Sequence, residues 1–191
     1  VDDSVGHCLE LLYGTGTDDM AGYAAGLPLL HAPGTVWNYS SGTTNIVARV
    51  LGDAVGGDRE HVEAFLQDRL FGPAGMTSAI PKFDARGTFV GSSYVYATAR
   101  DFARFGQLAL DDGIVDGRRI LPEGCCASAR TQAAFDDEGG FGYGRHWWLW
   151  PEFPGSFAAH GYEGQYTLAV PERDLVVVHL ASQCIRIRGF A

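Results

Sequence analysis

The stretch that decides the fold class lies near the end of the chain, where residues 165–181 read QYTLAVPERDLVVVHLA. Two runs rich in β-branched and apolar residues, 165–170 and 175–181, flank the tetrapeptide PERD. A connection this short fits an antiparallel hairpin and cannot hold the crossover that joins parallel strands. Similar aromatic runs at 141–150 and 157–162 precede it, separated by Pro and Gly. The last third of the chain is therefore predicted to form an antiparallel sheet.

Upstream of this sheet, apolar residues recur at helical spacing between glycine-rich loops. The clearest pattern covers residues 46–57 and stops at a Gly-Gly pair. Thr17, Asp58 and Thr98 are predicted to cap three further helices, because each precedes an apolar-periodic segment. Pro122 suits the first turn of a fifth helix.

Helices followed by an antiparallel sheet indicate the α+β class. We expect a helical lobe over residues 15–135 and an antiparallel sheet lobe over residues 140–185, within one partial domain that spans residues 1–191. The length suits a single domain made of two lobes.

Composition excludes several classes of protein. Hydrophobic residues make up 46% and charged residues 19%, which is enough apolar material for a core and excludes intrinsic disorder. The net charge of -9 would repel phosphate backbones and anionic membranes, so no nucleic-acid partner is expected. No apolar run approaches the roughly 20 residues of a membrane span. The acidic clusters lack the spacing of a calcium loop, and no metal site is predicted.

Residues 33–42 read PGTVWNYSSG and lead directly into the predicted helix. They resemble the Tyr-x-Asn region of the serine β-lactamase, penicillin-binding-protein and class C-type esterase superfamily. The resemblance implies that Tyr39 is a general acid/base and that Ser41 orients it. A phenol ordinarily titrates near pH 10, so this role near neutral pH requires neighbouring cations or a concerted proton relay. A tyrosine that simply packs in its loop is the alternative.

A second stretch, HGYEGQ at residues 160–165, followed by PERDL, resembles the family's Lys-Thr-Gly or His-x-Gly strand and the hairpin after it. Residues 91–106 support the same resemblance, which is strongest to the esterase and 6-aminohexanoate-dimer hydrolase branch. It implies that His160 hydrogen-bonds a substrate carboxylate or tunes Tyr39, although a structural histidine is the common alternative. It also implies an oxyanion site along Gly161, Tyr162 and Glu163, with a backbone N–H from Tyr162 or Glu163.

Aromatic side chains alternate along the preceding run, so one face of that strand must meet the core. The other face either packs as well or forms a wall of the acyl pocket. The residues concerned are Tyr143, Trp147, Trp148 and Trp150.

The family's nucleophile motif, Ser-x-x-Lys, does not occur in these 191 residues. The single lysine is Lys82, and Pro81 prevents Ser78 from sharing a helical turn with it. Ser41 stands where the class C pattern has Asn, and Tyr162 stands where the strand motif commonly has Gly. A serine hydroxyl cannot offer the donor and acceptor pair of a carboxamide, so an ester or amide is favoured over a β-lactam.

The resemblance implies a β-lactamase-like fold whose N-terminal part is missing, with the site in the cleft between the lobes. It implies part of a serine hydrolase that cleaves a small-molecule ester or amide through an acyl-enzyme, without a cofactor. The competing hypothesis is a catalytically inactive β-lactamase-like protein that binds a ligand or serves as an assembly subunit. The residues leave the compartment open, cytoplasmic or secreted.

The chain alone is predicted to be inactive, because the nucleophile would lie upstream of it. An incomplete sheet exposes apolar surface and unpaired edge groups, so self-association or a partner that supplies the missing piece is expected. Light scattering would detect self-association as a mass above that of one chain, and a cooperatively melting monomer would contradict it.

Overall fold

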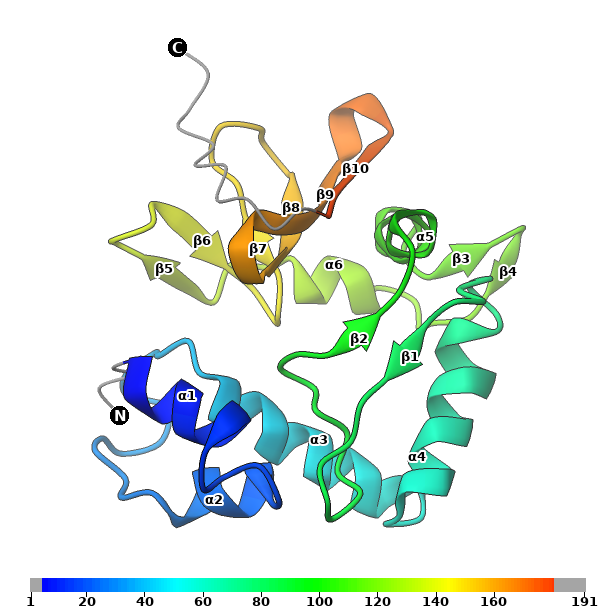
Figure 1. The fold of residues 1–191 in the computed structure, drawn as a ribbon. Coiled ribbons are helices and arrows are strands. Elements are labelled where there is room, and N and C mark those ends of the chain that lie inside the picture. Colours follow the sequence, from blue (N-terminus) through cyan, green and yellow to red (C-terminus); the bar gives the residue numbers. More distant parts are fainter. Residues whose placement is uncertain (1–4, 181–191) are drawn as a thin grey trace. The chain divides into compact units, whose positions relative to one another are not determined.

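The computed structural model describes residues 5–180 (Figure 1). The helices are α1 (Val5–Tyr13), α2 (Met20–Gly26), α3 (Ser41–Val55), α4 (Arg59–Leu66), α5 (Ala99–Leu110) and α6 (Cys125–Ala129), with a π-helical turn at Gln67–Phe71. The strands are β1 (Ile80–Pro81), β2 (Val95–Tyr96), β3 (Ile114–Val115), β4 (Arg118–Arg119), β5 (Ala134–Asp136), β6 (Phe141–Tyr143), β7 (Trp148–Leu149), β8 (Phe157–Gly161), β9 (Gln165–Val170) and β10 (Leu175–His179). This combination confirms the predicted α+β class.

Side-chain caps begin most of the helices. Asp58 accepts the backbone N–H of His61 at the start of α4, and Thr98 accepts that of Asp101 at the start of α5, as the sequence predicted. Ser40 accepts the N–H of Thr43 and starts α3 two residues earlier than expected. Each cap satisfies an N–H group that has no partner within its own helix.

The cap of α2 is Asp19, so the prediction of Thr17 was wrong. The Asp19 carboxylate accepts the N–H of Gly22, whereas the Thr17 hydroxyl donates to the carbonyl of Gly14. Asp19 also pairs with Arg49 at 2.9 Å, and these contacts together hold its pKa below the ordinary value. The carboxylate therefore joins the start of α2 to the side of α3.

The six-stranded sheet has the order β10-β9-β8-β7-β6-β5, and every neighbouring pair is antiparallel. The predicted hairpin is present: Val170 pairs with Leu175, and a short 3-10 turn at Pro171–Arg173 joins the two strands. Asp174 completes the turn in the left-handed region, at φ 46°. Consecutive strands thus lie side by side across the whole sheet.

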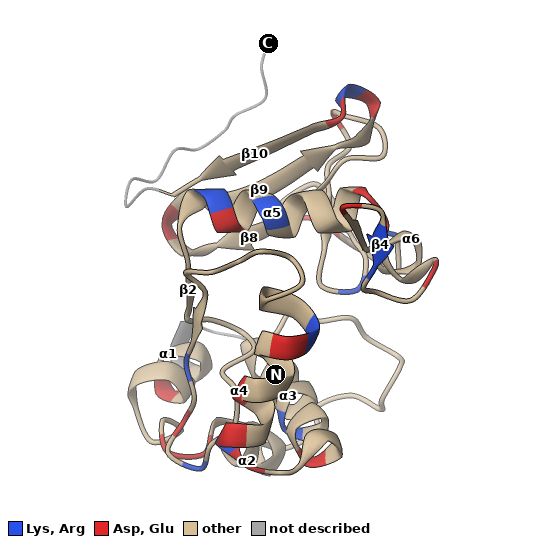
Figure 2. Ribbon diagram, turned by 90° about the vertical axis from the view of Figure 1, so that its right-hand side faces the viewer, with Lys and Arg blue, Asp and Glu red and all other residues tan. Residues whose placement is uncertain are grey.

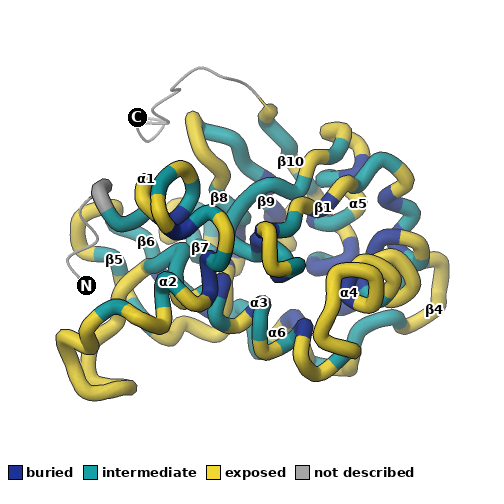
Figure 3. Tube along the Cα trace, turned by 60° about the horizontal axis from the view of Figure 1, so that its bottom comes forward, coloured by how far each residue is buried: buried dark blue, intermediate teal, exposed yellow. Residues whose placement is uncertain are grey.

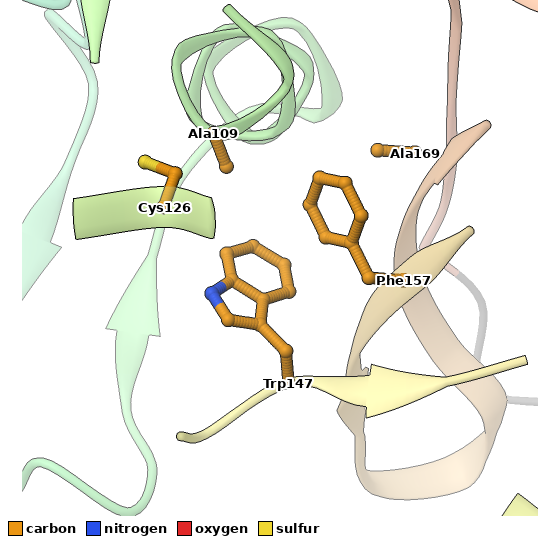
Figure 4. Close-up of a cluster of buried hydrophobic side chains, with 5 residues drawn as sticks. All are labelled: Ala109, Cys126, Trp147, Phe157 and Ala169. Atoms are coloured by element: carbon orange, nitrogen blue, oxygen red, sulfur yellow. The ribbon is translucent and has the colours of Figure 1, made fainter. Parts of the chain in front are cut away.

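One face of this sheet packs against α5 and α6. The buried residues of that core are Ala109, Cys126, Trp147, Phe157 and Ala169 (Figure 4). Helix α5 lies close to the strands at Gly106, where a Cβ atom would come within 2.8 Å of both the Val176 and Thr167 side chains. The approach requires a residue without a side chain at that position.

Asp101 anchors the first turn of α5. It is 2% exposed, and its carboxylate accepts the backbone N–H and the hydroxyl of Ser78, each at 2.7 Å. Arg104 pairs with the same carboxylate, and these contacts hold its pKa below the ordinary value for aspartate. Acidic and basic residues both lie along this helix (Figure 2). Ser78 therefore belongs to the hydrogen-bond network that anchors the start of α5. Lys82 is exposed, and its Nζ atom lies 5.8 Å from the centre of the Tyr96 ring.

The chain divides into two compact units. Unit 1 contains α1 to α4 with β1 and β2, and Leu11, Met20 and Val90 are buried together in it. Unit 2 contains α5, α6 and the strands from β3 onward, together with residues 69–79. The expected helical lobe at 15–135 is thus shared between the units, because α5 contacts β9 and β10.

Candidate functional site

Tyr39 lies at the end of the loop that joins α2 to α3. Every residue from 28 to 39 in this loop is exposed (Figure 3), and the Tyr39 side chain is 47% exposed. Ser40, which follows it directly, has extended backbone and caps α3 through its hydroxyl, 3.4 Å from the N–H of Thr43. The cap defines where the chain enters the helix, and Tyr39 lies two residues before the first residue of α3.

Ser41 is the first residue of α3, and its hydroxyl lies 3.7 Å from the Cys8 thiol on α1. Its carbonyl accepts a hydrogen bond from Asn45 Nδ2, at 3.1 Å. Asn45 is fully buried and also donates to the Ser92 hydroxyl at 3.1 Å. The sequence did not reveal the contact with Cys8, because α1 was not predicted. An orienting role of Ser41 toward Tyr39 stays a prediction.

His160 lies on β8 within a cluster of aromatic rings. Its Nε2 atom is 2.9 Å from Trp150 Nε1, whose N–H donates to it. Trp148 stacks on the imidazole, with ring centres 5.3 Å apart and planes inclined by 15°. Three rings contact it edge-on at 5.5 to 5.8 Å, those of Phe141, Trp150 and Tyr166. We refer to Phe141, Trp148, Trp150, His160 and Tyr166 as the aromatic cluster.

The aromatic cluster shows where the two faces of the alternating aromatic run lie, while an acyl-pocket wall stays a prediction. Trp147 is 9% exposed and packs in the core with Phe157, so it has a structural role. Trp148 and Trp150 are half-buried and contact His160. The alternation predicted two faces correctly, but it did not indicate which ring would meet the histidine.

Burial removes water from the imidazole and lowers the pKa of His160 to about 4. Desolvation disfavours the charged form of a histidine, whose ordinary pKa is near 6.5. His160 is therefore uncharged at neutral pH. In this state it can donate one hydrogen bond and accept one.

We expect the stability of unit 2 to fall as the pH decreases from about 6.5 to about 4, because unfolded His160 binds a proton in this window and folded His160 does not. The contribution is up to about 1.4 kcal/mol per pH unit. His160→Gln removes the titrating group but keeps an acceptor for Trp150, so its stability should depend less on pH. Urea unfolding of both proteins at pH 7, 5 and 4 gives the free energy of unfolding at each pH. If this free energy changes equally with pH in the two proteins, His160 is not the group responsible.

The predicted oxyanion residues lie in the tight turn between β8 and β9. Gly161 ends β8 and pairs with Gln165. Tyr162 is 83% exposed, and its carbonyl accepts a hydrogen bond from Gln165 Nε2 at 3.0 Å. Glu163 has left-handed backbone at φ 57°, as does the following Gly164 at φ 78°. A non-glycine residue in this region is uncommon and marks a turn with a specific backbone direction.

The predicted site residues fall into two groups. Tyr39 and Ser41 belong to unit 1, whereas His160, Gly161, Tyr162 and Glu163 belong to unit 2. Within residues 5–180, no three His, Cys, Asp or Glu side chains gather in a way that could hold a metal ion. No helix in that part of the chain is both long and apolar enough to cross a membrane.

Two proteins and one solved structure illustrate what this chain is similar to. The 6-aminohexanoate-dimer hydrolase of Paenarthrobacter ureafaciens is 29% identical over 157 residues, which cover 76% of this chain and 39% of that protein. An uncharacterized protein of Mycobacterium tuberculosis is 24% identical in an alignment that covers 92% of this chain and 56% of that protein. The structure of a Bacillus anthracis protein named as a 6-aminohexanoate-dimer hydrolase matches with a TM-score of 0.72 and 27% identity, over 85% of this chain and 42% of that one.

The chain thus spans between 39% and 56% of the length of these curated relatives. The model of the family described as Beta-lactamase matches residues 3–184, which is nearly the whole sequence. On this match, the chain belongs to the Beta-lactamase family.

Proposed function

We propose that the natural protein is a serine hydrolase that cleaves a small-molecule ester or amide through an acyl-enzyme. Membership of the Beta-lactamase family supports this proposal, as do two relatives whose names are those of hydrolases. Ester and amide substrates are preferred to a β-lactam because Ser41 replaces the carboxamide of the class C pattern.

In the proposed reaction, a serine upstream of this chain attacks the acyl carbonyl and forms the acyl-enzyme. Tyr39 accepts the hydroxyl proton and passes it to the leaving group, and water then releases the acid. The observation that carries this role is the place of Tyr39, which is exposed and directly precedes Ser40, the cap of α3. The proposed reaction requires no metal or organic cofactor.

The turn after His160 is proposed to supply the oxyanion donor. Backbone N–H groups aimed at the developing negative charge typically contribute a few kcal/mol to a transition state. The left-handed backbone of Glu163 supports this role, because it fixes the direction of the neighbouring amide groups. His160, on the strand that leads into this turn, is proposed to hydrogen-bond the substrate.

One observation favours a second candidate, an inactive relative that binds a ligand or serves as an assembly subunit. Ser-x-x-Lys does not occur in the 191 residues. The two candidates predict different results when the natural protein reacts with a serine-directed fluorophosphonate. One adduct in its intact-mass spectrum would support the hydrolase, whereas a protein that stays unlabelled under conditions that label a known serine hydrolase would exclude it.

A further inference from the structure

We propose that Trp150 holds His160 as the neutral tautomer with its hydrogen on Nδ1, so that His160 acts as an uncharged hydrogen-bond donor and not as a base or a cation. Trp150 is then a positioning residue for the site. This inference deepens the proposed function and rests on it for its catalytic meaning, although the tautomer itself can be measured without any substrate.

The direction of one hydrogen bond carries the argument. An indole nitrogen always bears hydrogen and can only donate. Trp150 Nε1 lies 2.9 Å from His160 Nε2, so Nε2 must present a lone pair. A protonated imidazole has hydrogen on both nitrogens and cannot accept this bond, and the other neutral tautomer has hydrogen on Nε2. The hydrogen of His160 is therefore on Nδ1.

The ring contacts keep the imidazole in this orientation. Trp148 covers one face of the imidazole, while Phe141 and Tyr166 contact it edge-on. These contacts set the plane of the ring, and turning it over within that plane would move Nε2 away from the indole and lose the hydrogen bond. Because five rings meet here, the imidazole is held by packing as well as by the hydrogen bond.

Trp150 is itself anchored by a buried residue. Its backbone N–H donates to the Ser156 carbonyl at 3.2 Å, and its carbonyl accepts from the Ser156 hydroxyl at 3.4 Å. Ser156 is 2% exposed and precedes β8, the strand that carries His160. The donor and the acceptor are thus connected through one short segment of the sheet.

Within residues 5–180, the titratable group that contacts the His160 imidazole is a tyrosine and not a carboxylate. Tyr166 on β9 contacts the imidazole, and His179 on β10 contacts the Tyr166 ring while its Nδ1 lies 2.9 Å from the Gly164 carbonyl. Glu163 lies on the exposed turn. The low pKa of His160 agrees with an environment made mainly of rings.

The tautomer limits the roles that His160 can take in the proposed reaction. Nε2 is occupied by the indole, so it cannot receive the proton of Tyr39 or of any other group. The N–H on Nδ1 can donate to an uncharged acceptor such as an ester or amide carbonyl, but it brings no positive charge for a carboxylate.

The test is nitrogen NMR of the natural protein with 15N-labelled histidine, using His160→Gln to assign the signals. Between pH 5 and pH 7 we expect Nε2 of His160 to give the signal of an unprotonated ring nitrogen and Nδ1 that of a protonated one. Trp150→Phe keeps a ring but removes the donor, and it should raise the pKa of His160 by about one unit. Trp148→Phe is the matched control: it keeps a ring over the imidazole and leaves the Trp150 donor in place, so Nε2 should stay unprotonated.

Hydrogen on Nε2 in the unmodified protein would overturn the inference, and so would a titration that is the same in Trp150→Phe. If Trp150→Phe does not fold, the spectrum of the unmodified protein still decides. The fluorophosphonate reaction is read separately: an unlabelled protein with hydrogen on Nδ1 would reject the proposed hydrolase and keep the tautomer. A protein that reacts with the fluorophosphonate but carries hydrogen on Nε2 would support the proposed hydrolase and reject the tautomer.

Discussion

Replacing Tyr39 with phenylalanine is expected to slow acylation of the natural protein by about 10²- to 10⁴-fold, the range typical for loss of a general acid/base. The substitution removes one oxygen from a side chain that is 47% exposed, so it leaves no cavity in the core. The rate of labelling by the fluorophosphonate, followed by mass spectrometry, measures the loss. Thermal unfolding should occur at the same temperature as in the unmodified protein, within a few degrees.

Tyr96→Phe is the matched control for this experiment. Tyr96 is 55% exposed on β2 and loses the same oxygen, but no role in catalysis is proposed for it. Its labelling rate should stay within about twofold of the original, because an exposed substitution outside the site rarely changes function. Full retention of the labelling rate in Tyr39→Phe would reject Tyr39 as the proton carrier, and equal losses in both variants would point to a general effect of removing a hydroxyl.

Replacing Phe157 with alanine is expected to lower the free energy of unfolding by about 3–5 kcal/mol. Phe157 is fully buried, packs edge-on against Trp147 with ring centres 4.9 Å apart, and lies below Arg130, whose guanidinium carbon is 4.7 Å from the ring centre. The substitution removes these contacts and leaves a cavity between the sheet and α5. Urea unfolding followed by tryptophan fluorescence measures the change.

Phe135→Ala provides the comparison. Phe135 lies on β5, an edge strand, and is 49% exposed, so its loss should change stability by less than about 1 kcal/mol. Similar losses at the two positions would mean that Phe157 does not have the central place in the core that Figure 4 shows.

The sequence predicted those parts of the fold that depend on local chemistry. Asp58 and Thr98 cap their helices as expected because a cap bonds to residues only three positions away. The β9–β10 hairpin was also predicted, because a short turn joins two long apolar runs. Helix α1 was missed, and so were β1 and β2, since Ile80 pairs with the distant Tyr96 and two-residue strands carry too little pattern.

The candidate site was predictable only in part, for a related reason. Resemblance to a family indicated Tyr39 and His160, but it did not indicate the partner of His160. Trp148 pairs with Ala158 across β7 and β8, and the backbone of Trp150 lies opposite Ser156, not opposite His160. The bond to His160 is therefore made by the long Trp150 side chain and does not follow from strand pairing. The alternation of aromatic residues showed which side chains share a face, but it did not show which atoms would meet.

The order of the six strands has a consequence for how unit 2 folds. Each strand pairs with the next one along the chain, so every pairing closes a short loop and loses little chain entropy. The contacts of α5 with β9 and β10 are different, because β3 to β8 all lie between them in the sequence. The contacts of α5 with these two strands therefore join residues that are far apart in the sequence, and contacts of this type slow folding. We therefore expect the meander of strands to form early and the docking of α5, with Gly106 against Val176, to complete the unit.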